Sequence, residues 1–238
     1  MSNPTQSSNN FIVILWGAHG SGKTTFLEES SRTFKDRFIP IFGDLYGNKH
    51  TVEEKKRTVG EFLEVPYPLI IEGKRYFDHT IFSSIEQLFE SSSKEIIIVI
   101  TTSTVDDSVR RINERRKNRN QSTNWVYPQK GEYEVKNRFL NKLRSLYTEN
   151  PLFWSRQTLV IQDITSDFAE SWKPIKQMIH TRLLQVPPSD FFELNSYPIV
   201  SEFLNLFNKN YDQPFVKGGK VQGGSFDLEL FKQYIINS

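Results

Sequence analysis

The chain has 238 residues, of which 37% are hydrophobic and 13% aromatic, enough for one α/β domain with an addition or at most two small domains. It contains no cysteine, so a disulfide framework and a thiolate metal site are both excluded. The net charge of +2 says little about partners. The first ten residues have no basic start and no apolar segment, and the strongly apolar runs are only strand-sized, so we expect a cytoplasmic protein without a membrane span or secretory leader.

A strand and a glycine-rich loop follow the polar start of the sequence. The first ten residues, MSNPTQSSNN, predict a disordered tail. Phe11 to Trp16 form an apolar, β-branched run that is typical of a buried parallel strand. The run leads into GAHGSGKT, residues 17–24, which matches the G-x-x-x-x-G-K-[ST] pattern and precedes helix-forming residues. The predicted order is therefore strand, phosphate-binding loop and helix.

The residue types of this loop suit an anionic ligand. Glycine tolerates the positive φ values that turn successive backbone N–H groups inward around an oxygen anion. Lys23 is expected to contact the β- and γ-phosphates of a nucleotide, and the Thr24 hydroxyl is expected to bind Mg²⁺. The predicted nucleotide-binding residues are Gly17, Gly20, Ser21, Gly22, Lys23, Thr24 and Thr25.

Strands and helices alternate through the rest of the first 185 residues. Strand-like apolar runs cover residues 37–42, 67–73, 95–102 and 158–164. Helices are predicted over residues 25–35 and 51–64, through 81–89, from a capping-box pattern at Thr104, over 133–147, and up to Leu184. Residues 115–134 are polar and lack periodicity, so they predict a loop.

This alternation predicts an α/β fold with a doubly wound, parallel, five-stranded sheet, because parallel strands need right-handed crossovers. Ligands of such sheets bind at the carboxyl ends of the strands. Gly17, Asp44, Glu72, Thr101 and Asp163 stand at predicted strand ends, so they are expected around one crevice. Residues 186–238 are expected to form a C-terminal helical extension, with short helices over 200–207 and 226–237.

Positive charge is concentrated in one segment. Residues 110–144 contain eleven Lys or Arg against three Glu, and the cations are interleaved with Trp125, Tyr127 and Tyr133. Cations bind phosphates and aromatic rings stack on bases, so this segment suits a nucleic-acid strand. A solvated helix with its aromatic residues packed on the core is the open alternative.

Phosphate loops occur in kinases, GTPases and motor ATPases. The base-specifying Asn-Lys-x-Asp of GTPases is missing, because NKHT at residues 48–51 has a threonine in place of the aspartate. Motor ATPases usually show an acidic pair at the end of the metal-binding strand, whereas the third predicted strand ends in the single Glu72. These two departures favour a kinase.

Over residues 11–184 the order of elements and the loop motif resemble the phosphate-loop kinases that include thymidylate and other nucleoside monophosphate kinases, deoxynucleoside kinases and 5′-polynucleotide kinases. The segment 131–147, GEYEVKNRFLNKLRSLY, is also similar to the helix that follows the lid in thymidylate kinases. The resemblance implies a P-loop NTPase fold of kinase type over residues 11–185, with ATP and Mg²⁺ as cofactors and an arginine-bearing lid over about residues 110–132. It implies catalytic roles for Arg111 and Arg115 and a nucleotide-binding role for Arg116.

The resemblance also suggests the remaining catalytic residues. Asp44, in IFGDLYG, resembles the aspartate with which polynucleotide kinases activate an acceptor hydroxyl, and it is the favoured general base. Glu72 lies where deoxynucleoside kinases carry the carboxylate of a Glu-Arg motif, although two residues separate it here from Arg75. Glu72 is favoured as a metal ligand with Thr24, and Arg75 and Lys23 are expected as catalytic cations.

The phosphate acceptor is open at this stage. A hydroxyl in DNA, either a 5′ end or a hydroxylated base such as 5-hydroxymethyluracil, is slightly favoured because the basic surplus extends past the expected lid. A free nucleoside or nucleoside monophosphate is the first alternative, and a nucleotide-switched or ATP-driven nucleic-acid-binding protein is the second. The Asn-, Ser-, Ile- and Lys-rich composition is compatible with a phage origin.

Overall fold

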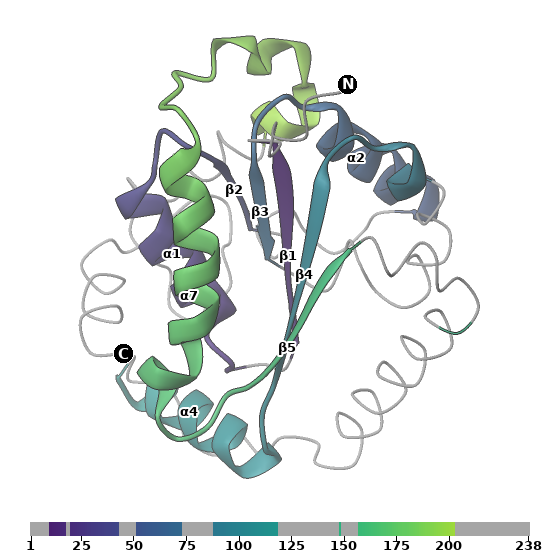
Figure 1. The fold of residues 1–238 in the computed structure, drawn as a ribbon. Coiled ribbons are helices and arrows are strands. Elements are labelled where there is room, and N and C mark those ends of the chain that lie inside the picture. The colour runs from purple at the N-terminus through teal and green to yellow at the C-terminus, as the bar shows by residue number, and fades with distance from the viewer. Residues whose placement is uncertain are drawn as a thin grey trace.

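The structure is a computed structural model that describes residues 10–17, 20–42, 51–72, 88–118, 148 and 157–202. Five parallel strands form one sheet in the order β2-β3-β1-β4-β5 (Figure 1). The strands are β1 (Phe11–Gly17), β2 (Ile39–Phe42), β3 (Leu69–Glu72), β4 (Glu95–Thr102) and β5 (Thr158–Asp163). The predicted α/β fold with a doubly wound sheet of five parallel strands is therefore confirmed.

The central strand β1 is buried on both faces. Ile12, Ile14 and Trp16 pack into one hydrophobic cluster, and residues 11, 13 and 15 pack into a second cluster on the other face. Both edges of the strand are paired, with β3 on one side and β4 on the other. A strand in this position needs an apolar side chain at every residue, which explains its unbroken hydrophobic run.

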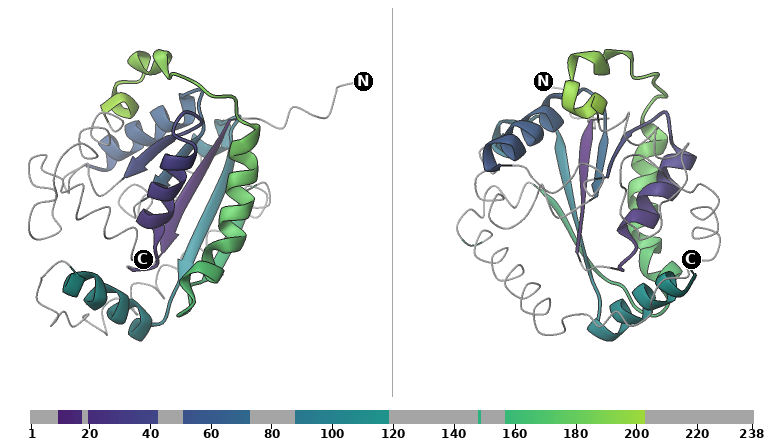
Figure 2. Two further views of the ribbon diagram at one scale, coloured as in Figure 1. Left: turned by 90° about the vertical axis from the view of Figure 1, so that its left-hand side faces the viewer. Right: turned by 180° about the vertical axis from the view of Figure 1, so that it is seen from behind.

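Helices cover both faces of the sheet (Figure 1, Figure 2). On one face lie α1 (Lys23–Thr33) and α7 (Phe168–Gln185), and on the other lies α2 (Val52–Glu64). The fourth helix, α4 (Val105–Asn118), lies at the carboxyl ends of the strands. Among the described residues, no helix combines the length and apolarity needed to cross a bilayer.

Side-chain caps fix where two of these helices begin. The Thr51 hydroxyl accepts the Glu54 backbone N–H at 3.2 Å, and the Glu54 carboxylate accepts the Thr51 backbone N–H at 2.7 Å, so α2 begins with a complete capping box. At α4 the Thr104 hydroxyl accepts the Asp107 backbone N–H at 3.1 Å. Both predicted helix starts are confirmed by these contacts.

Several element boundaries differ from the predicted ones by one or two residues, and the starts of α1 and β2 have a clear structural reason. Helix α1 begins at Lys23, two residues earlier than expected, because Gly22 takes a left-handed conformation and its carbonyl already accepts the Phe26 N–H at 2.9 Å. Strand β2 begins at Ile39, two residues later than expected. The preceding Arg37 is used elsewhere, since its guanidinium donates to the carbonyls of residues 184 and 186, at 2.9 and 2.6 Å, where α7 ends.

Residues 186–202 pack at the end of the sheet opposite to α4, where the 3-10 helix η2 (Phe192–Ser196) lies (Figure 1). Leu194 and Val200 belong to the same hydrophobic cluster as Ile12 and Ile14 of β1. The Val200 N–H also donates to the Glu61 carboxylate at 2.6 Å. The proposed division of the chain at residues 185 and 186 stays a prediction, and the helix predicted over 226–237 lies outside the described residues.

Of the helix predicted through residues 81–89, the structure describes only its end, where residues 88–91 are helical and Phe89 is buried. The loop predicted over 115–134 overlaps the last turn of α4, which continues as helix to Asn118. The helix predicted over 133–147 lies outside the described residues.

Lys94 is a buried cation at the start of β4. Its side chain is 6% exposed and its ammonium donates to the Tyr67 carbonyl at 3.0 Å. Burial lowers the pKa of Lys94 from its usual 10.5 to about 7. The Lys94 ammonium therefore binds its proton less tightly in the folded chain than in the unfolded chain. The desolvation of this charge lowers the free energy of unfolding.

Replacement of Lys94 by Met should raise the free energy of unfolding at pH 7 by about 2–5 kcal/mol, because the variant no longer has an ammonium to desolvate. The cost in the native chain is full below the folded pKa and disappears as the pH rises towards the unfolded pKa. The advantage of Lys94→Met should therefore shrink between pH 7 and pH 10, as urea unfolding would measure. Lys173→Met, at an exposed position, is the control, and an equal gain at both pH values for Lys94→Met would contradict this account.

Candidate phosphate-binding site

The glycine-rich loop joins β1 to α1, and its three glycines have the positive φ values that the sequence predicts. Gly17, Gly20 and Gly22 have φ values of 138°, 70° and 84°, which lie in the region that favours glycine. A Cβ on Gly17 would collide with the Thr101 carbonyl, and a Cβ on Gly22 would collide with the Phe168 ring. Glycine is therefore required at both positions by conformation and by space.

Helix α1 starts directly after this loop, at Lys23. Its N-cap is Gly22, which has no side chain to cap the first N–H groups of the helix. A helix of eleven residues carries a partial positive charge at its N-terminus, which favours an anion there. The loop and the start of the helix therefore have the properties that suit a phosphate group.

Lys23 is buried beside the loop. Its side chain is 9% exposed, and its ammonium donates to the Gly17 carbonyl at 3.1 Å and to the Ser21 hydroxyl at 3.3 Å. These contacts hold a positive charge next to the loop amides and away from bulk solvent. The next residues differ in their surroundings, since Thr24 is half-buried and Thr25 is buried in the first turn of α1.

Thr24 and Glu72 meet at the carboxyl end of β3. The Thr24 hydroxyl donates to the Glu72 carboxylate at 3.1 Å, although 48 residues separate them in the sequence. The contact follows from the sheet order, because β3 pairs with β1 and Glu72 stands opposite Leu15, two residues before the loop. Glu72 is 6% exposed, so its charge lies in a poorly solvated position.

The Thr24 and Glu72 pair fits a magnesium ion. Mg²⁺ prefers oxygen ligands and is typically held by one or two protein oxygens, several waters and the phosphates of a nucleotide. Within the described ranges no group of three or more His, Cys, Asp or Glu side chains could hold a metal by itself, so an ion here would need phosphate and water ligands. One hydroxyl and one carboxylate beside a phosphate loop are the donor set that such an ion uses.

Helix α4 packs against the phosphate loop. An added Cβ on Gly20 would lie 3.2 Å from the Ile112 side chain and 3.3 Å from the Ser108 carbonyl. Arg110 and Arg111 lie in the middle of this helix, and Arg115 and Arg116 are partly exposed in its last turn. The three arginines predicted to contact phosphate, Arg111, Arg115 and Arg116, therefore lie on the helix that packs against the loop.

Arg111 is held by neighbouring backbone and hydroxyl groups. Its guanidinium donates to the Ser103 hydroxyl and, at 3.1 Å, to the Thr165 carbonyl in the segment between β5 and α7. Burial lowers the pKa of Arg111. By contrast, Arg110 is exposed and forms an ion pair with Asp107 at 2.7 Å. In this arrangement Arg111 ties α4 to the segment that precedes α7.

Arg111→Ala should lower the free energy of unfolding by about 1–3 kcal/mol, because the variant loses two hydrogen bonds to a charged donor. Arg110→Ala is the matched control and should leave the free energy of unfolding nearly unchanged, since an exposed ion pair contributes little. Chemical unfolding of both variants at pH 7 measures the difference. Equal effects would show that Arg111 has no anchoring role.

Of the remaining predicted site residues, the structure describes some and leaves others undescribed. Asp44, Arg75 and the aromatic residues interleaved with the basic segment lie outside the described residues. Asp163 is exposed at the end of β5, where its carboxylate accepts the Thr102 hydroxyl at 3.0 Å. Gly17, Glu72 and Thr101 do share one edge of the sheet, as their strand registers require.

Two hydrogen bonds to the loop were not predicted from the sequence. The Ser21 hydroxyl and the Thr101 hydroxyl are 2.7 Å apart, and Thr101 also donates to the Trp16 carbonyl at 3.2 Å. The Trp172 indole donates to the Ser21 carbonyl at 2.8 Å from α7. Thr101 was expected at the crevice only from its place at a strand end, and no local pattern around Trp172 indicates its contact.

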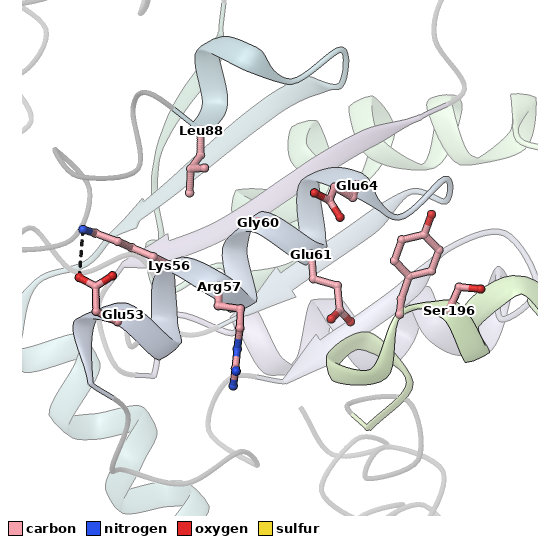
Figure 3. Close-up of a pocket in the computed structure, with 9 residues that line it drawn as sticks. Glu53, Lys56, Arg57, Gly60, Glu61, Glu64, Leu88 and Ser196 are labelled. Atoms are coloured by element: carbon pink, nitrogen blue, oxygen red, sulfur yellow. Dashed lines mark hydrogen bonds and ion pairs between the residues drawn. The ribbon is translucent and has the colours of Figure 1, made fainter.

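A separate groove lies along α2 (Figure 3). It has a volume of about 620 Å³ and is lined by Glu53, Lys56, Arg57, Gly60, Glu61, Glu64, Leu88, Ser196 and Tyr197. None of these residues belongs to the phosphate loop or to the strand ends around it. Burial raises the pKa of Glu61 at this groove.

The chain is similar to known proteins only at the level of solved structures. No model of a known protein family matches the chain, and no curated protein matches its sequence. Similar solved structures include a gluconokinase from Sinorhizobium meliloti 1021, with a TM-score of 0.42 and 15% identity over 85% of this chain and 98% of that chain. They also include a protein from Chloroflexus aurantiacus j-10-fl that is described as a kinase, with a TM-score of 0.46 and 14% identity over 73% of this chain and 98% of that chain. Both TM-scores are below 0.5, so these two likenesses by themselves assign no activity to the chain.

Proposed function

We propose that the chain is an ATP- and Mg²⁺-dependent phosphotransferase that transfers the γ-phosphate of ATP to a nucleotide-type acceptor. One observation carries the proposal: the buried Lys23 ammonium, the open N-terminus of α1 and the Thr24–Glu72 pair surround a single glycine-rich loop. These are a cation, a set of backbone donors and a hard-oxygen metal site. They are the three groups that a triphosphate with Mg²⁺ needs.

Phosphoryl transfer depends mainly on positioning and on the stabilisation of charge. In this scheme the loop amides and Lys23 bind the terminal phosphates and fix the direction of the transferring group. Thr24 and Glu72 are the residues that would hold Mg²⁺, and the bound ion would supply positive charge beside the transferring phosphate. We assign Arg115 and Arg116, on the helix that packs against Gly20, as further cations for the phosphates, and Asp44 as the base for an acceptor hydroxyl.

Within this proposal we favour an acceptor hydroxyl that belongs to DNA. The support is the cationic surplus of residues 110–144, which is larger than a few phosphate-contacting arginines require. Its first part lies on α4, beside the phosphate loop. A cationic helix next to a phosphoryl-transfer site would attract a polyanionic acceptor.

The test is an acceptor panel with γ-labelled ATP and Mg²⁺. The panel holds single-stranded and duplex DNA with 5′ hydroxyls, DNA that contains 5-hydroxymethyluracil, free nucleosides and free nucleoside monophosphates. Label on DNA is the expected result. Label only on a free nucleoside or monophosphate would keep the phosphotransferase and overturn the DNA acceptor. Phosphate released to water, with no labelled acceptor, would overturn the phosphotransferase in favour of an ATP-hydrolysing binding protein.

A further inference from the structure

Trp172 reaches the phosphate loop from the second turn of α7. Its side chain is fully buried, and its ring stacks on Phe26 of α1 with ring centroids 5.0 Å apart. The indole N–H donates to the Ser21 carbonyl at 2.8 Å. An added Cβ on Gly22 would lie 3.0 Å from the same nitrogen. One side chain from a distant part of the sequence therefore contacts two consecutive loop residues.

This contact orients one peptide unit of the loop. The Ser21 carbonyl and the Gly22 N–H belong to the same planar trans peptide, so they point in opposite directions. Because the carbonyl is directed to the indole, the Gly22 N–H is directed away from α7. The Ser21 side chain is fixed at the same time, since its hydroxyl is 2.7 Å from that of Thr101 on β4.

We propose that Trp172 is a positioning residue for nucleotide binding: its indole N–H holds the Ser21–Gly22 peptide in the orientation that presents the Gly22 N–H to a phosphate oxygen. The inference rests on the proposed function of the loop. It adds that α7 holds the loop ready for phosphate through the hydrogen bond from the indole to the Ser21 carbonyl. A loop that is already oriented does not lose backbone freedom when the ligand arrives.

The first test compares Trp172→Phe with Ile179→Ala. Phenylalanine keeps an aromatic ring against Phe26 but has no N–H for the Ser21 carbonyl. Ile179 lies in the same helix and the same hydrophobic cluster, and it is fully buried, so its replacement lowers stability without removing a bond to the loop. Isothermal titration with ATP and Mg²⁺ gives the dissociation constant, and steady-state rates separate KM from kcat.

We expect Trp172→Phe to raise the dissociation constant and the KM for ATP about 3–10-fold, as the loss of one hydrogen bond implies, with kcat changed less than about twofold. Ile179→Ala should lower the melting temperature and leave the affinity for ATP unchanged. Unchanged affinity in Trp172→Phe, or an equal loss in both variants, would overturn the positioning role. If the native chain binds no ATP, the proposed function fails and this inference fails with it.

A second test measures the indole N–H signals of the native chain, so it does not depend on whether a variant folds. The four tryptophans give separate indole N–H signals in a nitrogen-15 spectrum. The Trp172 signal should shift when ATP and Mg²⁺ are added, because its hydrogen-bond partner belongs to the residue next to Gly22. ATP binding without a shift of this signal would contradict the proposal.

Discussion

Lys23→Met should reduce kcat for phosphotransfer by about 10²–10³-fold, which is the typical effect of removing one electrostatic contact from a transition state. Lys23 is 9% exposed, and its ammonium lies within hydrogen-bond distance of the Gly17 carbonyl and the Ser21 hydroxyl. A positive charge in such a poorly solvated position interacts strongly with phosphate oxygens. Methionine fills a similar volume and removes only the charge and its donors. Initial rates at saturating ATP measure the effect.

The control for Lys23→Met is Lys173→Met. Lys173 is exposed on α7, in an ion pair with Glu170, and its replacement should leave the rate unchanged. Circular dichroism should confirm that Lys23→Met is folded. If this folded variant kept the native rate, Lys23 would have no role in transfer, and the phosphate-binding interpretation of the loop would be wrong.

Glu72→Gln is expected to lower kcat at limiting Mg²⁺ by about 10²-fold and to raise the Mg²⁺ concentration needed for half-maximal activity. Glutamine can still accept the Thr24 hydroxyl bond that the structure shows at 3.1 Å, so the local geometry should be retained while the negative charge is lost. A neutral oxygen is a weaker ligand for Mg²⁺ than a carboxylate. Titrations of activity with MgCl₂ measure the difference.

Glu64→Gln is the control for this charge change, because Glu64 is exposed at the end of α2. Its Mg²⁺ dependence should equal that of the native chain. A Glu72→Gln variant with the native Mg²⁺ dependence would remove Glu72 from the metal site and leave Thr24 as its only assigned ligand.

The sequence predicted the elements whose pattern is local. Strand β4 was expected over 95–102 and has those bounds, because its middle residues, 96–100, form the unbroken apolar run that is typical of a strand buried on both faces. The positive φ values of the loop glycines follow from a motif of eight residues. The pairing of Thr24 with Glu72 was expected in outline, since both residues were predicted to contribute to one metal site.

Contacts between distant residues could not be predicted in the same way. The Trp172 indole and the Ser21 carbonyl are 151 positions apart, and the Ser21 and Thr101 hydroxyls are 80 apart. Nothing near Trp172 in the sequence distinguishes it from an ordinary core aromatic residue. The hydrogen bond from Arg111 to the Thr165 carbonyl was also not predicted. Arginines in a cation-rich helix suggest contacts with an anionic ligand, and the sequence does not show that a backbone carbonyl lies within reach.

The packing of residues 186–202 bears on how far this chain can be shortened. Leu194 and Val200 supply part of the hydrophobic cluster under α2, and the Ser189 N–H donates to the Asp36 carbonyl at 2.7 Å. A fragment that stopped at Gln185 would uncover this cluster and expose apolar surface to water. Limited proteolysis should therefore find no stable product that ends before Val200, and recombinant fragments intended for crystallisation need to include that residue.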